Sequence, residues 1–439
     1  MRTVDRNQIL YILCPFVAVV AMVINMPEGL MAVGLGAVLV FIVIHLIRNH
    51  EDGIFLQQVF LTGLLPRIIF ASFIFSAEAY AYFGGDAQTY DFRARVILQV
   101  LFGTSTPADV IQQSFSTSGS GWGMNWFVAF IYLLVGQNLF AVMIIECVIG
   151  ASTALLIYRI VMEIYNNRRA ARIAAWMVAL FPAMIIWSSQ ALKDGITVFL
   201  LVLMMICIIE LQKKLNLLYT FLLFSCLFGI LSLRFYIFYM AAIAVTGSFL
   251  IGTSNTFKQM LQRLTAFATI GLILMYIGAI NTANANFDKY GTLEAVQRSR
   301  GDLAISAGSG YGKDLDVSTT EGAVVALPIG FTYLMLAPFP WEVRNVRQAL
   351  VVPESLVWWC LMPFLGIGLW YTIKHRWRNA VAILIFTFML TFAYSIFQGN
   401  VGTAYRQRTQ IQVFLFIFIA VGIVIQREKA ENRQISIRR

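Results

Sequence analysis

Charge is scarce in this sequence: of its 439 residues, 12% are charged and 59% are hydrophobic. An average soluble domain has about 25% charged and about 45–50% apolar residues. A chain with so few charges cannot cover a soluble surface, which excludes a soluble protein and indicates an integral membrane protein. The formal net charge is +10. We interpret it as the basic bias of cytoplasmic segments rather than as a nucleic-acid-binding surface, so no nucleic-acid partner is expected.

Histidine and cysteine are also few. The three histidines, His45, His50 and His375, map to the predicted cytoplasmic side, which excludes a histidine-rich zinc site on the opposite face. A general base there is therefore expected to be a carboxylate, and a divalent cation held by carboxylates stays open as a cofactor. The five cysteines all fall inside apolar runs and are predicted to be core residues, not disulfides or metal ligands. P-loop, Rossmann, HExxH and nucleophile-elbow motifs are missing as well.

Long apolar runs are what the sequence does have. A helix that crosses a bilayer needs about 20 largely apolar residues. About twelve such segments are predicted, which makes the fold class an all-α polytopic membrane protein: 8–25, 30–47, 64–83, 138–160, 171–188, 195–212, 216–233, 235–252, 264–282, 354–373, 380–397 and 409–426. Two shorter stretches, 126–135 and 323–336, are predicted to be interfacial or re-entrant helices.

Basic residues predict the orientation of these spans. The basic turns NNRRAAR, LQKKLN, KQMLQR and KHRWR and the basic tail all fall on one side, which we assign to the cytoplasm together with both termini. The first apolar run has no small-residue cleavage site after it, so no signal peptide is expected. The whole chain, 1–439, is expected to form one membrane domain with two long outer loops, 84–137 and 283–353, that carry the short helices.

Polar residues gather where the predicted spans end on the outer side. The motif GGDAQTYDF places Asp86, Tyr90 and Asp91 directly after the third span, on the side where few charged residues are expected. Further candidates follow at other outer span ends: Lys193, Asp194, Arg234, Tyr236, Trp341, Glu342, Arg344, Arg406 and Arg408. Several of these are cations on the side where the positive-inside rule disfavours them, which makes them candidates for function.

Each candidate also has a plain structural interpretation. Polar residues at span ends commonly cap helices and meet lipid headgroups. Lys193 and Asp194 could form a local ion pair at a helix start, and Arg344 could belong to a headgroup-binding face. Two acids are predicted inside spans, where a charge is costly and pairing is expected. Glu78 could join the Asp86 site, whereas Glu146 could equally make a structural hydrogen bond to a neighbouring helix.

Carboxylates beside a ring of Arg and Lys at the outer headgroup level suit an anionic, lipid-borne substrate. Guanidinium groups match phosphate in two-point contacts, and lysine adds a compact charge. A carboxylate can deprotonate an acceptor hydroxyl while cations stabilise charge on a phosphate leaving group. Together these groups suit sugar transfer from a polyprenyl-phosphate carrier to a lipid or glycan acceptor.

The layout resembles the GT-C superfamily of integral-membrane glycosyltransferases, especially bacterial proteins similar to protein O-mannosyltransferases and aminoarabinose transferases. The resemblance is carried by GGDAQTYDF, by NWFVAFIYLLVGQN with its Gly-x-Asn turn, and by LFPAMIIWSSQALKD after a basic turn. It implies that Asp86 is the catalytic base and that Lys193, Arg234, Arg406 and Arg408 hold the carrier phosphate. It also implies a bacterial inner-membrane enzyme of cell-surface polysaccharide or glycolipid synthesis.

Three other functions fit parts of the pattern. An O-antigen-type polysaccharide polymerase or ligase would also depend on outer-face arginines. A lipid or glycan transporter is less compatible, since transporters tend to show internal repeats and broken helices at mid-membrane. A scaffold in a polysaccharide export complex would leave the outer Asp and Arg residues replaceable.

Overall fold

The computed structural model describes most of the chain and is helical throughout the part described. The described residues are 6–83, 85–104, 107–117, 120–251, 265, 268–269, 271–273, 275–276, 278–306, 309–312, 314–343 and 345–437. Among them, seven helices are long and apolar enough to cross a membrane, and five further apolar helices are shorter. The prediction of an all-α, multi-pass membrane protein is confirmed.

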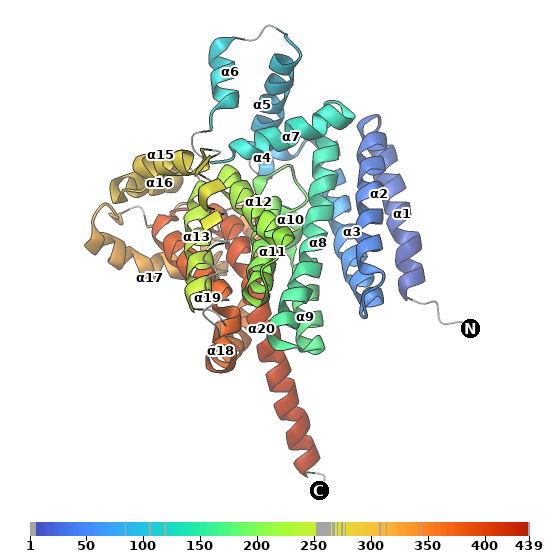
Figure 1. The fold of residues 1–439 in the computed structure, drawn as a ribbon, viewed down its shortest axis with the longest axis vertical. Coiled ribbons are helices and arrows are strands. Elements are labelled where there is room, and N and C mark those ends of the chain that lie inside the picture. The colour runs from blue at the N-terminus through green and yellow to red at the C-terminus, as the bar shows by residue number, and fades with distance from the viewer. Residues whose placement is uncertain are drawn as a thin grey trace. The chain divides into compact units, whose positions relative to one another are not determined.

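The chain divides into two compact units, of which the first holds residues 1–158, 175–202 and 232–234. Its helices are α1 (Arg6–Ile24), α2 (Glu28–Ile47), α3 (Gly53–Ser76), α4 (Tyr80–Phe83), α5 (Asp86–Leu101), α6 (Ala108–Phe115), α7 (Trp122–Val135), most of α8 (Leu139–Tyr165), the end of α9 (Arg168–Leu180), α10 (Pro182–Trp187) and the start of α11 (Lys193–Lys213). α1, α2 and α3 pack side by side, as do α5 and α7 (Figure 1). One hydrophobic core joins α3, α5, α7 and α8.

The predicted span 171–188 is wrong as one helix, because α9 ends at Leu180 and α10 starts at Pro182. Proline has no N–H, so the carbonyl of Val178 loses its helical partner. The buried Arg67 of α3 takes over the freed backbone groups: it donates to the carbonyls of Ala179 at 2.8 Å and Val178 at 3.4 Å. Its Nε also donates to Ser188 Oγ at 2.8 Å, so one arginine ties α3 to both short helices.

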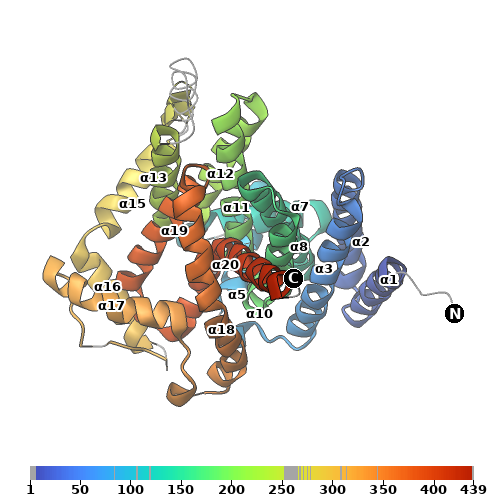
Figure 2. The same cartoon turned by 90° about the horizontal axis from the view of Figure 1, so that it is seen from below.

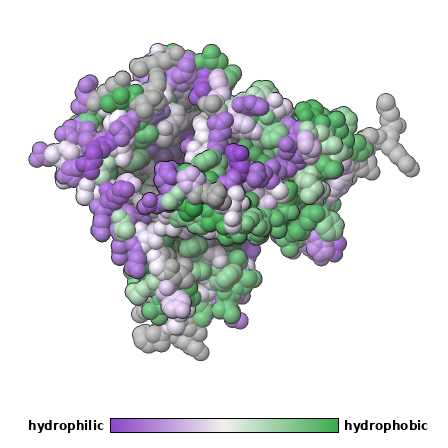
Figure 3. All heavy atoms as spheres, turned by 90° about the horizontal axis from the view of Figure 1, so that it is seen from above, coloured by the Kyte–Doolittle hydropathy of each residue, from purple (hydrophilic) through white to green (hydrophobic). Residues whose placement is uncertain are grey.

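Helix α2 carries its apolar side chains on the outside of its unit. Leu30, Phe41 and Leu46 are 54%, 69% and 75% exposed. Figure 3 shows the hydrophobic surface of this N-terminal region at its right-hand side. A contiguous apolar face of this kind indicates contact with lipid, as expected for a spanning helix.

The second unit holds residues 159–174, 203–231 and 235–439. Besides the remaining parts of α8, α9 and α11 it contains α12 (Leu217–Leu233, up to Leu231), α13 (Phe235–Ile251), α15 (Ala279–Tyr290), α16 (Leu293–Ser306), α17 (Thr320–Leu336), η1 (Pro340–Glu342), α18 (Val346–His375), α19 (Trp377–Phe397) and α20 (Val401–Ile437). α17 and α19 pack together, and so do α13 and α19.

Helices α18 and α20 make the most extensive helix contact of this unit, and Figure 2 shows them from below. A Cβ on Gly368 would lie 1.8 Å from the carbonyl oxygen of Phe418, and one on Gly422 would lie 2.0 Å from that of Phe364. The two backbones therefore touch where both helices lack a side chain, as small residues allow in membrane helices.

Several predicted span boundaries are corrected by the structure. α3 covers 53–76 and not 64–83, so Glu78 lies in a turn after the helix rather than inside a span. α20 begins at Val401, eight residues before the predicted span 409–426, and α18 begins at Val346. Of the predicted span 264–282, residues 264, 266, 267, 270, 274 and 277 lie outside the described residues, and its last four residues, 279–282, begin α15. The stretches 126–135 and 323–336 are short helices, α7 and α17, as predicted.

Candidate functional site

The motif GGDAQTYDF forms the start of helix α5 in the first unit. Gly85 precedes the helix and Asp86 is its first residue, partly exposed. Tyr90 follows four positions later, which places it on the same helix face one turn further on, and its side chain is buried. The motif thus sets a carboxylate and a phenol hydroxyl along one face of α5.

Gly121, the residue directly before α7, lies beside two of the predicted site residues, Tyr90 and Lys193. Its φ is +94°, a backbone conformation that favours glycine. A Cβ on Gly121 would lie 3.0 Å from Tyr90 Oη and 3.2 Å from Lys193 Nζ. The hydroxyl and the ammonium group therefore converge on one point of backbone that has no side chain.

Lys193 is the first residue of α11, and its Nζ lies 3.4 Å from Ser120 Oγ. Ser120 in turn donates to the carbonyl of Leu233 at 2.8 Å. Residues 120–121 are therefore held between α11 and the segment 232–234, which belongs to the same unit. The predicted candidates Tyr90 and Lys193 are brought together from segments about a hundred residues apart.

Asp194 and Arg234 form a buried ion pair next to this point, with side chains 0% and 4% exposed. A buried pair of this kind fixes geometry, because removing either partner leaves a charge without compensation. The pair anchors the start of α11, and hence Lys193, to the segment that accepts the hydrogen bond from Ser120. The sequence left open a local ion pair of Lys193 with Asp194; the structure shows Asp194 paired with Arg234.

Asp91 has partners within its own unit. It accepts a hydrogen bond from Tyr132 at 2.6 Å and pairs with Arg95 at 2.7 Å. Burial and the hydrogen bond to Asp91 raise the pKa of the Tyr132 hydroxyl far above its usual value. The contacts join α5 to α7.

Glu78 is exposed, with φ at +48°. Burial, together with the nearby charges of Glu78 and Asp91, raises the pKa of Tyr80. Glu78 therefore lies within electrostatic reach of the residues that lead into α5.

Two buried polar side chains of this unit are not among the site residues that the sequence predicts. Glu146 is completely buried in α8, and neither carboxyl oxygen has a hydrogen-bond partner among the described residues. Its Oε2 lies 2.7 Å from where a Cβ on Gly195 would be, beside the first turn of α11. The interhelical hydrogen bond that was one expectation for Glu146 is not found in the described part of the chain. The amide of Asn125 in α7 is likewise buried and unpartnered there; no signal in the sequence distinguishes it from other interfacial asparagines.

The cations of the second unit differ in environment. Arg408 is fully buried, donates to the carbonyls of Ala337 at 2.9 Å and Met335 at 3.2 Å, and lies over the rings of Trp358 and Tyr405. Arg406 is partly exposed. Residues two apart on a helix point in different directions, and both arginines lie in α20, so they do not form a paired cationic site.

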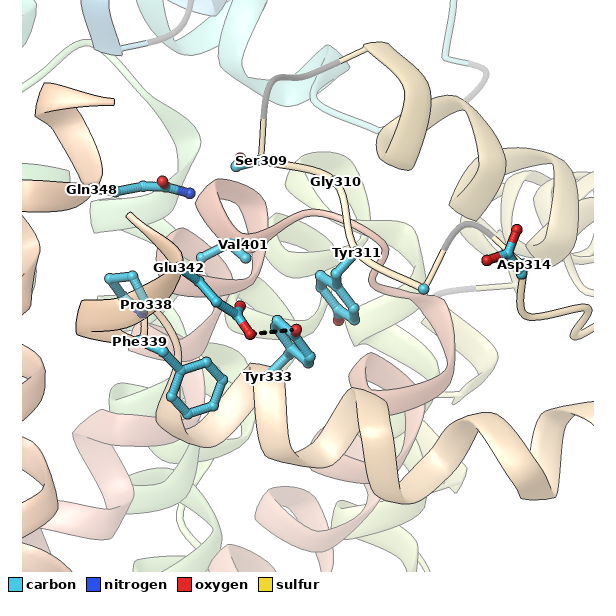
Figure 4. Close-up of a pocket in the computed structure, with 11 residues that line it drawn as sticks. Ser309, Gly310, Tyr311, Asp314, Tyr333, Pro338, Phe339, Glu342, Gln348 and Val401 are labelled. Carbon is cyan, nitrogen blue, oxygen red and sulfur yellow. Dashed lines mark hydrogen bonds between the residues drawn. The ribbon is translucent and has the colours of Figure 1, made fainter. Parts of the chain in front are cut away.

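The remaining predicted residues also lie in the second unit. The Tyr236 hydroxyl is 3.4 Å from the side-chain amide of Gln407. Trp341 is 74% exposed and stacks on Phe339. Glu342 accepts a hydrogen bond from Tyr333 at 3.1 Å and lines a cavity of about 390 Å³ (Figure 4). Arg344 lies outside the described residues.

Among the described residues, no three His, Cys, Asp or Glu side chains come close enough together to hold a metal ion. The carboxylate-bound divalent cation expected as an option from the sequence therefore stays a prediction.

Comparison with known proteins gives a family match for a part of the chain that includes Lys193. Residues 121–278 match the model of the dolichyl-phosphate-mannose-protein mannosyltransferase family. The matched segment starts at Gly121 and includes Lys193, Asp194 and Arg234. The predicted resemblance to GT-C glycosyltransferases is confirmed. No curated protein matches the sequence significantly.

Two solved structures of an archaeal enzyme are similar to this chain. The oligosaccharyltransferase of Archaeoglobus fulgidus in the apo form shares 12% identity with a TM-score of 0.44. The oligosaccharyltransferase AglB of the same organism, in complex with an inhibitory peptide and a dolichol-phosphate, shares 13% identity with a TM-score of 0.43. In both cases the alignment covers 72% of this chain and 43% of the other. The chain thus spans less than half the length of these proteins.

Proposed function

We propose that this chain, whose residues 121–278 match a mannosyltransferase family model, is an integral-membrane glycosyltransferase. Its donor would be a sugar linked to a polyprenyl phosphate, and its acceptor a lipid or glycan hydroxyl on the non-cytoplasmic face. The observation that carries the proposal is the convergence of Tyr90 Oη and Lys193 Nζ on Gly121. Tyr90 lies one helical turn from Asp86 in α5.

The proposed chemistry assigns a different task to each group. The Asp86 carboxylate takes the proton from the acceptor hydroxyl, and the acceptor oxygen attacks the anomeric carbon of the donor sugar. The bond from that carbon to the phosphate oxygen breaks, and the carrier phosphate leaves with the bonding electrons. Lys193 and Tyr90 stabilise the negative charge that develops on the phosphate, since both donors are already in place before the reaction.

The buried pair of Asp194 and Arg234 is assigned a positioning role. Its contacts hold the first turn of α11 in place, and Lys193 is the first residue of that turn. The fully buried Arg408 is assigned to the packing of α20. The enzyme is proposed to lie in the bacterial inner membrane with both termini in the cytoplasm, and to act in the synthesis of a surface polysaccharide or glycolipid.

The test is a transfer assay with purified protein in lipid nanodiscs. The donors are radiolabelled polyprenyl-phosphate mannose, glucose and aminoarabinose, each supplied with a total lipid and glycan extract as acceptor. We expect one donor to label a product with the wild-type protein. Asp86→Asn is expected to reduce this rate by about a thousandfold or more, because the amide cannot accept the proton. Lys193→Ala is expected to reduce it by about a hundredfold.

Two variants serve as matched controls. Asp109→Asn changes an exposed acid of α6, in the same predicted loop, and Lys213→Ala changes the lysine at the other end of α11. Both should retain wild-type rates. Transfer by Asp86→Asn at the wild-type rate would remove Asp86 from the mechanism. Products that carry long repeating chains, instead of a single added sugar, would favour the polymerase alternative.

A further inference from the structure

The second unit contains a cavity that the proposed chemistry at Asp86 and Lys193 does not use. It is lined by residues from the predicted second outer loop and by the first residue of α20: Ser309, Gly310, Tyr311, Gly312, Asp314, Tyr333, Pro338, Phe339, Glu342, Gln348 and Val401. Its volume of about 390 Å³ falls within the range of about 300–1,000 Å³ that is usual for small-molecule sites. Figure 4 shows Tyr311, Tyr333, Phe339 and Glu342 below Gly310, with Gln348 and Asp314 on either side.

Hydrogen bonds and ring stacking hold the wall of the cavity in place. The loop pairs with the start of α20, since Tyr311 N donates to the Gly399 carbonyl at 2.8 Å and Val401 N donates to the Ser309 carbonyl at 3.0 Å. The Tyr311 and Tyr333 rings stack with centroids 4.1 Å apart and planes 4° from parallel. The facing wall at Ala337 is held by the hydrogen bond from the buried Arg408.

Polar groups inside this frame point to a ligand. The Tyr333 hydroxyl donates to Glu342 at 3.1 Å, which leaves further acceptor capacity on that carboxylate. Tyr311 is 6% exposed, and its hydroxyl has no hydrogen-bond partner in the part of the chain that the structure describes. A buried hydroxyl without a partner costs free energy, unless a ligand or water supplies the missing bond.

Charge decides the class of ligand. The charged side chains among the described lining residues are Asp314 and Glu342, both acidic, and Figure 4 shows them on opposite sides of Tyr311. These two carboxylates favour a neutral ligand with hydroxyl donors; the Arg300 guanidinium lies over the Tyr311 ring at 5.7 Å and is not among the lining residues. Carboxylates and the Gln348 amide can bond sugar hydroxyls, and the rings of Tyr311, Tyr333 and Phe339 offer flat apolar faces.

We propose that this cavity binds a neutral saccharide, with Glu342 and Tyr311 hydrogen-bonding its hydroxyls and the aromatic rings packing on its faces. That this saccharide is the acceptor of the transfer reaction rests on the function proposed above. The binding itself does not, because it involves neither Asp86 nor the carrier phosphate.

Binding without any donor therefore tests the site separately from the enzyme. Purified protein in nanodiscs is titrated with maltose, cellobiose and α-1,2-mannobiose, and saturation-transfer NMR reports contact and affinity. We expect saturable binding of at least one disaccharide. Glu342→Gln and Tyr311→Phe should each weaken it by about tenfold, the loss of one hydrogen bond to a charged or buried group. Glu321→Gln, which alters an exposed acid of α17 outside the cavity, should bind as the wild-type protein does.

Thermal unfolding of each variant verifies that the fold is kept, and Tyr333→Phe provides a second route if Tyr311→Phe does not fold. Failure of all three disaccharides to bind the wild-type protein would overturn the proposal. So would unchanged affinity in Glu342→Gln, or displacement of the disaccharide by an equal concentration of inorganic phosphate. Normal binding together with absent sugar transfer would retain the saccharide site and refute the proposed enzyme.

Discussion

Single residues decide which of the predicted polar groups can act on a substrate. The sequence offers several cations at outer span ends with no means of ranking them. Lys193 reaches toward Gly121, whereas Arg234 is paired with Asp194 and Arg408 is packed between aromatic rings. The difference follows from which helix face each occupies, and this depends on where the helix starts. Because α20 begins at Val401, Arg408 faces the interior of its unit while Arg406 remains partly exposed.

Gly121 permits a direct test of the point where Tyr90 and Lys193 converge. In Gly121→Ala the new methyl group would lie 3.0–3.2 Å from Tyr90 Oη and Lys193 Nζ, the two groups proposed to stabilise the donor phosphate. We expect at least a tenfold lower rate of sugar transfer, with a raised KM for the polyprenyl-phosphate donor. Initial rates at varied donor concentration measure both quantities.

The control for Gly121→Ala is Gly103→Ala. Gly103 has a similar φ of +75°, but an added Cβ there meets no atom within 4 Å. It therefore shares the backbone strain and lacks the contact. Equal rates in the two variants would show that strain, and not occupation of the site, lowers activity.

Helices show where sequence patterns are reliable and where they are not. Apolar runs locate α2, α8, α11, α12, α13 and α19 to within a few residues, because spanning helices need long apolar segments. Polar ends defeat the same method: α3, α18 and α20 extend beyond their apolar runs into segments that contain polar residues, among them Gln57, Gln348 and Arg408. The break at Pro182 could be suspected from the proline, but its partner Arg67 lies 115 positions away, and no local pattern connects the two.

The contact between α18 and α20 yields a prediction with opposite signs at neighbouring positions. Gly366 has open space for a Cβ, so Gly366→Ala should stabilise α18 by about 0.5–1 kcal/mol through helix propensity. Gly368→Ala places its Cβ against the Phe418 carbonyl and should destabilise the protein by about 1–3 kcal/mol. Thermal unfolding in a fixed detergent compares the two. A lower melting temperature in Gly366→Ala would contradict the open space at that position. An unchanged melting temperature in Gly368→Ala would contradict the close backbone contact.

For the molecule as a whole, the sequence was sufficient for the class of fold and for part of the site. Composition and apolar runs identify a multi-pass helical protein, and residues 121–278, which include Lys193, match the family model. The cavity beneath residues 309–312 was missed except for Glu342. Its wall depends on pairing between residues 309–311 and 399–401, almost ninety positions apart, and on the stacking of two tyrosines from different elements. No periodic pattern in the sequence predicts such long-range contacts.

The predicted orientation in the membrane, which is inferred from the distribution of basic residues, puts both proposed sites on one side. The prediction is that the loops 84–137 and 283–353 face the outside and that both termini face the cytoplasm. Single cysteines at the exposed positions Gln113, Glu294 and Glu431 test it, in a background whose five native cysteines are replaced by alanine.

A membrane-impermeant maleimide applied to spheroplasts should label Gln113→Cys and Glu294→Cys. It should label Glu431→Cys only after the membrane is permeabilised. The acceptor hydroxyl and the saccharide cavity require the same compartment, so opposite accessibility of Gln113→Cys and Glu294→Cys would separate the two sites and exclude the cavity as the acceptor site. Labelling of Glu431→Cys in intact spheroplasts would reverse the orientation, and would place the proposed sugar transfer on the cytoplasmic side.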